Sequence, residues 1–163
     1  MGAILWFVSA LSAVAEEPAP LPKEGSSSTI TIGSLTAKVL PLGKDRVQFS
    51  FEFLGASVSD DGKGLTHNAS VRCIGSVHAV NGAYETFTNS CILTRPDGDQ
   101  LFLTDKGTGR LGGQSQGTST ITGGTGKLAG ITGTSEWTRY NVRSALEGTA
   151  QTVTRSKLSY KLP

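Results

Sequence analysis

Arg46–Leu54, with the sequence RVQFSFEFL, is the stretch that most clearly indicates the fold. Apolar and polar side chains alternate strictly along it: Val47, Phe49, Phe51 and Phe53 against Arg46, Gln48, Ser50 and Glu52. A period of two is typical of a strand in a sheet with one buried face. The stretch therefore predicts a β-strand whose aromatic face lies in the core.

Short stretches of similar character recur from Thr29 to the C-terminus, separated by Gly, Asn and Asp turns, and no long window has a helical period. The predicted strands are Thr29–Val39, Arg46–Leu54, Asn68–Val80, Tyr84–Thr94, Gln100–Thr104, Thr118–Thr122, Ile131–Tyr140 and Glu147–Leu162. About eight short strands, with 21 glycines among the 163 residues, predict an all-β domain that is either a closed antiparallel barrel or a sandwich.

Asn81-Gly82 lies between two alternating runs and predicts a two-residue hairpin turn. A strict turn of this kind pairs Cys73 with Ser90, which leaves Cys73 and Cys91 one residue out of register. A β-bulge or a three-residue loop would bring the two cysteines opposite each other. We expect one of these two features if the cysteines form a disulfide.

The N-terminal run Gly2–Ala15 (GAILWFVSALSAVA) is uncharged and shorter than the about 20 residues of a membrane span. It ends in Ala13-Val14-Ala15, which predicts a signal peptide over residues 1–15, cleaved after Ala15, and a periplasmic or secreted protein. The segment before it lacks Lys and Arg, and a buried N-terminal helix is the alternative. Residues 16–28 (EEPAPLPKEGSSS) read as a linker, and residues 29–163 as the barrel domain.

Cys73 and Cys91 are the only cysteines in the chain. In the oxidising compartment that export implies, an isolated pair predicts one disulfide bond, and two reduced buried thiols are the alternative. The net charge is +2, without a dense basic stripe, so we expect no nucleic-acid partner. His67 and His78, the only histidines, have no other ligand at metal-binding spacing, so we expect no metal and no cofactor.

Three residues are candidates for ligand binding inside the predicted barrel. If Cys91 faces the interior, Glu85 and Asn89 face it too, because they differ from it by an even number of residues. The alternative for Glu85 is a solvated position at the barrel mouth. Trp137 is either a core-filling aromatic or a wall of a ligand pocket. No catalytic motif is recognisable elsewhere, and catalytic residues are not assigned.

Gly123–Gly133 (GGTGKLAGITG) resembles the GGTGK-type segment of the dirigent and allene oxide cyclase superfamily and of small exported bacterial proteins related to it. The order of elements is also similar, with the turn Arg95–Asp99 preceding the motif. The resemblance covers Thr29–Leu162 and implies an eight-stranded antiparallel barrel with a calycin-like interior. No catalytic residue carries over from it. Lys127 is followed by Leu128 and by no helical pattern, which argues against a phosphate-binding loop.

Three functions are compatible with these observations. The first is a non-catalytic module that binds a small apolar or amphipathic ligand, since an eight-stranded barrel can hold one such molecule. The second is an isomerase or cyclase, which the resemblance allows and which can work mainly by enclosing and orienting its substrate. The third is a structural or interaction protein of the cell envelope, for which self-association into a homo-oligomer would be expected.

Overall fold

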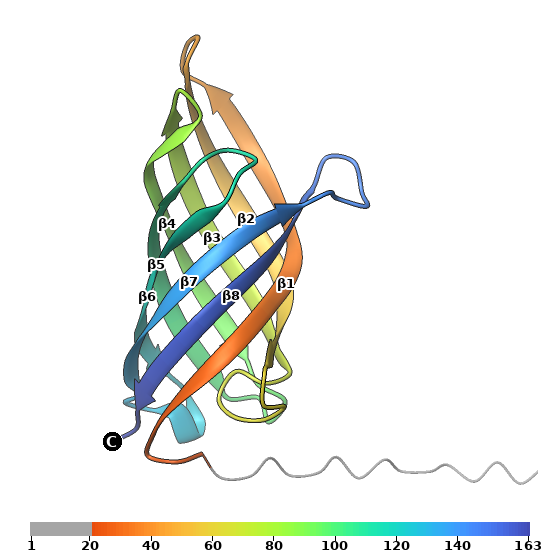
Figure 1. The fold of residues 1–163 in the computed structure, drawn as a ribbon. Coiled ribbons are helices and arrows are strands. Elements are labelled where there is room, and N and C mark those ends of the chain that lie inside the picture. Colours follow the sequence, from red (N-terminus) through yellow and green to blue (C-terminus); the bar gives the residue numbers. More distant parts are fainter. Residues whose placement is uncertain (1–20) are drawn as a thin grey trace, which may run out of the picture.

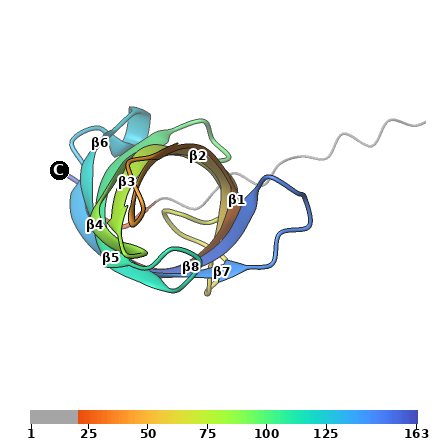
Figure 2. The ribbon, with the colours of Figure 1, turned by 90° about the horizontal axis from the view of Figure 1, so that it is seen from above.

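The computed structural model describes residues 21–163, which form a closed barrel of eight antiparallel strands (Figure 1). The strands are β1 (Glu24–Pro41), β2 (Arg46–Ser59), β3 (Ala69–Val80), β4 (Ala83–Thr94), β5 (Gln100–Gly109), β6 (Ser115–Gly124), β7 (Thr132–Val142) and β8 (Ala150–Lys161). Each strand pairs with the next, and β1 pairs with β8 to close the sheet, as the view down the barrel shows (Figure 2). The predicted all-β barrel is confirmed. The predicted signal peptide and the first part of the linker lie outside the described residues.

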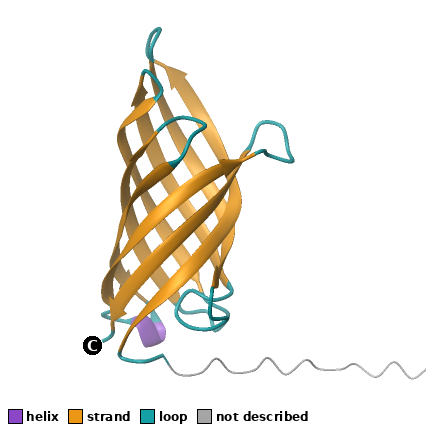
Figure 3. Cartoon of the chain, in the orientation of Figure 1, coloured by secondary structure: helices purple, strands orange, loops and turns teal. Residues whose placement is uncertain are grey.

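Several strands extend beyond the predicted limits. β1 begins at Glu24, inside the predicted linker, because Ser26–Ser28 pair with Lys157–Ser159 of β8. Its serines carry no apolar alternation, so the sequence pattern gives no sign of this pairing. β5 likewise continues to Gly109, where glycines replace the apolar residues that mark a strand. A single 3-10 helical turn, η1 (Gly126–Leu128), is the only helical element among the described residues (Figure 3).

The β3–β4 hairpin has the predicted turn and a predicted bulge. Asn81 and Gly82 have φ values of 51° and 74°, the left-handed conformation that a two-residue hairpin turn requires at both positions. The register shifts beside His78, because His78 pairs with Thr86 and the next residue with Tyr84. This bulge places Cys73 directly opposite Cys91, and the two form a disulfide bond. Both predictions about the cysteines are confirmed.

Apolar and polar side chains are unevenly distributed around the barrel interior. The strands β2, β3 and β4 contribute most of the buried aromatic and aliphatic side chains: Phe51, Phe53, Val71, Val77, Phe87 and Leu93. The strands β5 to β8 contribute Leu101, Ile121, Trp137, Leu158 and Tyr160 to the core and, beside them, five small or polar buried side chains: Asp105, Ser115, Ser119, Ser135 and Thr152. Polar groups of this kind inside a barrel need hydrogen-bond partners. Those of β5 to β8 are therefore candidates for contact with a bound molecule.

One end of the barrel is closed by loops. In the orientation of Figure 1 this is the lower end, where the C-terminus also lies. Leu65 and Thr66, in the loop between β2 and β3, are buried there, and the Thr66 carbonyl accepts a hydrogen bond of 2.7 Å from the Ser57 hydroxyl. Arg95 donates to the Leu65 carbonyl at 2.9 Å. A ligand would therefore approach the interior from the opposite end, which we call the mouth.

Candidate functional site

The mouth of the barrel contains a cavity of about 300 Å³. Volumes of this order are at the small end of the range for sites that bind small molecules. Most of the lining is apolar and comes from the first four strands: Leu35, Ala37, Val39, Val47, Phe49, Phe51, Val77, Tyr84 and Phe87. Phe51 and Phe87 stack with ring centroids 5.9 Å apart, and Tyr84 stacks on Phe87 at 6.1 Å. The cavity thus has a continuous aromatic wall.

Arg139 is the charged residue that lines this cavity. Its Nε donates a hydrogen bond of 3.2 Å to the Thr154 hydroxyl, which fixes the side chain against β8. Its guanidinium carbon lies 5.5 Å from the ring centroid of Phe87 and 5.1 Å from that of Trp137, distances typical of cation–π contacts. The guanidinium is therefore held in place by three contacts and presents a fixed positive charge to an apolar cavity.

A second, smaller cavity of about 80 Å³ lies deeper in the barrel and is also lined by Arg139. Beside it, directly paired positions place four polar residues in a row across β4 to β7: Asn89, Asp105, Ser119 and Ser135. Three buried polar atoms of this region have no hydrogen-bond partner among residues 21–163: Asn89 Nδ2, Asp105 Oδ1 and Trp137 Nε1. Asp105 and Trp137 line the inner cavity, which therefore offers one hydrogen-bond acceptor and one donor.

Asp105 and Arg139 are the two charged residues that line the inner cavity. Burial raises the pKa of Asp105, and the Ser119 hydroxyl, the positive charge of Arg139 and the Asn89 amide oppose this rise. Burial lowers the pKa of Arg139, and the negative charge of Asp105 counteracts it. A guanidinium remains protonated in proteins, whereas a carboxyl with a raised pKa can hold or release a proton closer to neutral pH.

Trp137 lines the inner cavity and is only 5% exposed. Its ring packs on Gly107 and Gly117 of the neighbouring strands, where a Cβ would overlap the indole. The glycine-rich sequence of β5 and β6 therefore makes room for this aromatic ring. Trp137 does not line the mouth cavity, so it is a core aromatic that also forms part of the inner cavity wall, and its role in ligand binding stays a prediction.

The expectation that Glu85 faces the interior is wrong. The bulge leaves Glu85 out of the pairing between β3 and β4, and its side chain points outward, 52% exposed, with Oε2 at 2.8 Å from Nδ1 of His78. Tyr84 takes the inward position instead and lines the mouth cavity. Asn89, beyond the bulge, keeps the predicted inward orientation and is 5% exposed. The bulge that aligns the cysteines thus also turns Glu85 away.

Sequence reasoning missed Asp105 and Arg139. Both follow an alternation that could have indicated them: Asp105 has the same parity as Leu101 and Leu103 on β5, and Arg139 the same parity as Trp137 on β7. When each strand is considered alone, a charged residue at an inward position interrupts the apolar alternation and indicates that the strand has ended. Only the closed sheet shows that the two charges share one interior.

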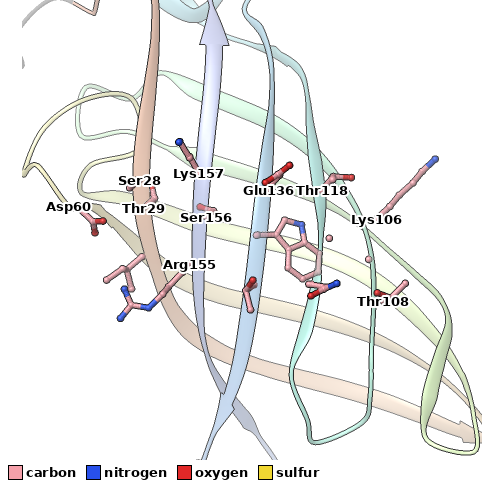
Figure 4. A pocket seen from close by; sticks show the side chains of 16 residues that line it. Ser28, Thr29, Asp60, Lys106, Thr108, Thr118, Glu136, Arg155, Ser156 and Lys157 are labelled. Atoms are coloured by element: carbon pink, nitrogen blue, oxygen red, sulfur yellow. The ribbon is translucent and has the colours of Figure 1, made fainter.

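A wider hollow of about 870 Å³ lies on the outer surface, over β5 to β8 and β1. Figure 4 shows its side chains, from Asp60 and Arg155 at one side to Lys106 and Thr108 at the other. Charges of both signs alternate here with hydroxyl groups, and the hollow is open to solvent. The mouth cavity is the better candidate site, because it is lined by apolar groups around a single oriented charge.

The motif Gly123–Gly133 lies at the closed end of the barrel, far from the mouth. The backbone N–H of Lys127 donates to Asp99 Oδ2 at 3.0 Å, and that of Gln100 donates to the Thr125 hydroxyl at 2.8 Å. Lys127 Nζ also lies 3.6 Å from Asp97 Oδ2. These contacts join the motif to the Arg95–Asp99 turn, and the two segments together help to close the lower end of the barrel.

Two further observations describe the part of the chain from residue 21 onward. No helix there is long and apolar enough to cross a membrane. No three His, Cys, Asp or Glu side chains within it gather closely enough to hold a metal ion.

The fold and the interior define a closed eight-stranded antiparallel β-barrel protein with a cavity at one end. No protein-family model matches the sequence, and no curated protein matches it. Among solved structures, the chain is similar to a pterocarpan synthase dirigent protein, with a TM-score of 0.48 and 10% sequence identity over 94% of this chain and 100% of the other. The motif-based resemblance to the wider superfamily remains a proposal.

Proposed function

We propose that the protein is exported and that it binds a small amphipathic molecule in the mouth cavity without transforming it. The observation that carries this proposal is the fixed guanidinium of Arg139 at an apolar cavity of about 300 Å³. The apolar body of the ligand would contact the aromatic wall formed by Phe49, Phe51 and Phe87. An anionic or strongly polar group of the ligand would meet Arg139, because a charge-assisted hydrogen bond is strong in a partly desolvated site.

Export is supported by the disulfide between Cys73 and Cys91, since such bonds persist mainly in oxidising compartments. It is also supported by the sequence of residues 1–15, which has the apolar run and the small-residue cleavage pattern of a signal peptide. Mass spectrometry of the protein recovered outside the cytoplasm tests this part. An N-terminus at Glu16 is expected, and recovery of the uncleaved chain from the cytoplasm would contradict it.

Ligand binding can be tested with 1-anilinonaphthalene-8-sulfonate, whose apolar rings and single sulfonate match the cavity and Arg139. Saturable binding with a one-to-one stoichiometry is expected. Ala37→Trp places a large side chain in the mouth cavity and should abolish this binding. Thr36→Trp is the matched control, because the preceding residue of the same strand does not line the cavity. Equal binding by both variants would place the probe elsewhere and contradict the proposal.

An isomerase or cyclase is the second candidate function, and Asp105 is the observation that favours it. A buried carboxyl with a raised pKa can accept and return a proton during a rearrangement. If this holds, the wild-type protein converts a bound compound to an isomer. The Asp105→Asn variant should bind the same compound, which is then recovered unchanged after incubation. Recovery of the unchanged compound from the wild-type protein would exclude that compound as a substrate.

A structural or interaction protein of the envelope is the third candidate. The outer surface of β1 to β4 carries exposed apolar side chains that a second copy could cover: Ile32, Leu54, Ile74 and Ile92. Sedimentation at several protein concentrations tests self-association. A concentration-dependent mass together with no saturable probe binding would favour this candidate over ligand binding.

A further inference from the structure

The mouth of the barrel is surrounded by exposed apolar side chains, which we call the apolar rim. They are between 42% and 66% exposed: Val39, Leu40, Leu42, Leu111, Val142 and Leu146. Single exposed apolar residues are common on protein surfaces, but a contiguous group of them marks an interaction site. The apolar rim is therefore a candidate interaction site.

The apolar rim belongs to three connections and the strand ends beside them, at the same end of the barrel. These are the β1–β2 turn, the β5–β6 turn and the loop between β7 and β8, all in the upper half of Figure 1, where the β7–β8 loop projects to the side. Val39 and Leu111 also line the mouth cavity. At these two residues the apolar rim adjoins the cavity lining directly.

Charged residues of the same end are mainly basic. On these connections, the β3–β4 hairpin and the adjoining strand ends there are five basic residues, Lys38, Lys44, Arg46, Arg110 and Arg143, against three acidic ones, Asp45, Glu85 and Glu147. Glu85 is in addition paired with His78. The rim therefore combines exposed leucines with an excess of positive charge.

We propose that the mouth end docks on an anionic lipid surface, with the apolar rim at the level of the acyl boundary and the basic residues against the headgroups. Interfacial binding of this kind adds the burial of apolar area to attraction by anionic lipids. A second copy is a less suitable occupant, because pairing two mouth ends would bring like charges together. Docking goes beyond the proposed ligand binding and does not depend on it.

The test is binding of the full chain to vesicles of phosphatidylcholine with and without about 30% phosphatidylglycerol, measured by co-sedimentation. The proposal predicts binding to the anionic vesicles that falls as salt is raised. The double variant Leu42→Asp/Leu146→Asp should weaken vesicle binding by roughly tenfold or more. Each substitution removes an apolar side chain that the lipid would bury and adds a charge that the anionic headgroups repel.

The matched control is Leu54→Asp/Ile74→Asp. Both residues are 57% exposed, but they lie on the outer face of β2 and β3 away from the mouth. This control should bind vesicles as the wild type does. Because every variant retains residues 1–20, any vesicle binding by that segment is the same in all of them. Lys44→Glu/Arg143→Glu should reduce binding to anionic vesicles and abolish its salt dependence.

A second measurement does not depend on destabilising substitutions. In a Trp6→Phe background, the tryptophan fluorescence of the Leu42→Trp variant should shift to shorter wavelength when anionic vesicles are added. The fluorescence of the Ile74→Trp variant should not shift. Three results would overturn the proposal: equal binding to neutral vesicles, equal loss in the rim and control variants, or an emission shift at residue 74 alone. Self-association that the rim variant abolishes, without vesicle binding, would assign the rim to a second copy instead.

Discussion

The guanidinium carbon of Arg139 lies 5.1 Å from the ring centroid of Trp137, two residues earlier on β7. Since side chains alternate along a strand, both residues point into the barrel. Arg139 lines the mouth cavity and the inner cavity, whereas Trp137 lines only the inner one. Arg139 therefore connects the two cavities, and Trp137 holds its guanidinium from the side of the inner one.

Arg139→Gln is expected to weaken binding of 1-anilinonaphthalene-8-sulfonate. A hydrogen bond to a charged group contributes about 1.5–3 kcal/mol, so the affinity should fall by roughly tenfold or more. Isothermal titration measures the change. Arg155→Gln is the control, because Arg155 lies on the outer hollow and not in the mouth cavity. An equal loss in both variants would mean that the sulfonate binds the outer surface.

The raised pKa of Asp105 predicts a pH dependence of stability. A carboxyl with a raised pKa binds its proton more tightly in the folded state. Its stabilising contribution is therefore complete below the ordinary value of 3.8 and is lost as the pH rises through the raised pKa. Urea unfolding at a series of pH values should show this decline, and Asp105→Asn should lack it. A variant that keeps the wild-type slope above 3.8 would contradict the prediction.

Asp97 should behave in the opposite sense. Burial raises its pKa, but the hydrogen bonds from Arg95 and the backbone of Asp99, and the charges of Arg95 and Lys127, lower it on balance. Its contribution is present above 3.8 and is lost as the pH falls through the lowered pKa. Asp97→Asn should therefore flatten the pH dependence of the unfolding free energy only on the acid side. Flattening above 3.8 would show that the two carboxyls are coupled.

Removal of the disulfide should destabilise the barrel. Cys73 and Cys91 are 18 residues apart, and closing a loop of this length contributes about 3 kcal/mol in the chain-entropy model. Cys73→Ala/Cys91→Ala should lose about that much in urea unfolding. Reducing agent should lower the wild-type stability to the level of the variant and leave the variant unchanged. A variant as stable as the oxidised wild type would refute the contribution.

Gly126→Ala and Gly98→Ala form a matched pair at the closed end. Both glycines have positive φ, 53° and 88°, so alanine costs backbone strain of about 1–3 kcal/mol at either position. A Cβ at Gly126 would in addition overlap the Asp99 carboxylate, whereas a Cβ at Gly98 meets nothing. Gly126→Ala should therefore lower the unfolding free energy more. Probe affinity at the mouth should be unchanged in both, and a loss there would mean that the two ends are coupled.

The sequence by itself determined the features that depend on neighbouring residues. The alternation in Arg46–Leu54 places Phe51 and Phe53 in the core, because side chains of a strand alternate between its two faces. Asn81-Gly82 determines the hairpin, because both residues adopt positive φ readily. The spacing of Cys73 and Cys91 around that turn predicts, if the two form a disulfide, either a bulge or a longer loop, and the structure has the bulge.

The location of that bulge was decided only by the tertiary structure. A disulfide constrains the total register between the turn and the cysteines, but not which residue leaves the pairing. Glu85 is the residue that leaves the pairing, and Tyr84 instead of Glu85 therefore lies at the cavity wall. The first residues of β1 are a similar case, since Ser26–Ser28 become a strand through pairing with β8 at the other end of the chain.

The candidate site was also decided by the tertiary structure. Asn89, Asp105 and Arg139 belong to three different strands, and closure of the sheet brings them into one interior. The raised pKa of Asp105 follows from that burial and from no local feature of its sequence. Local sequence patterns thus determine the strands and turns, whereas the cavity and its charges exist only once the eighth strand has paired with the first.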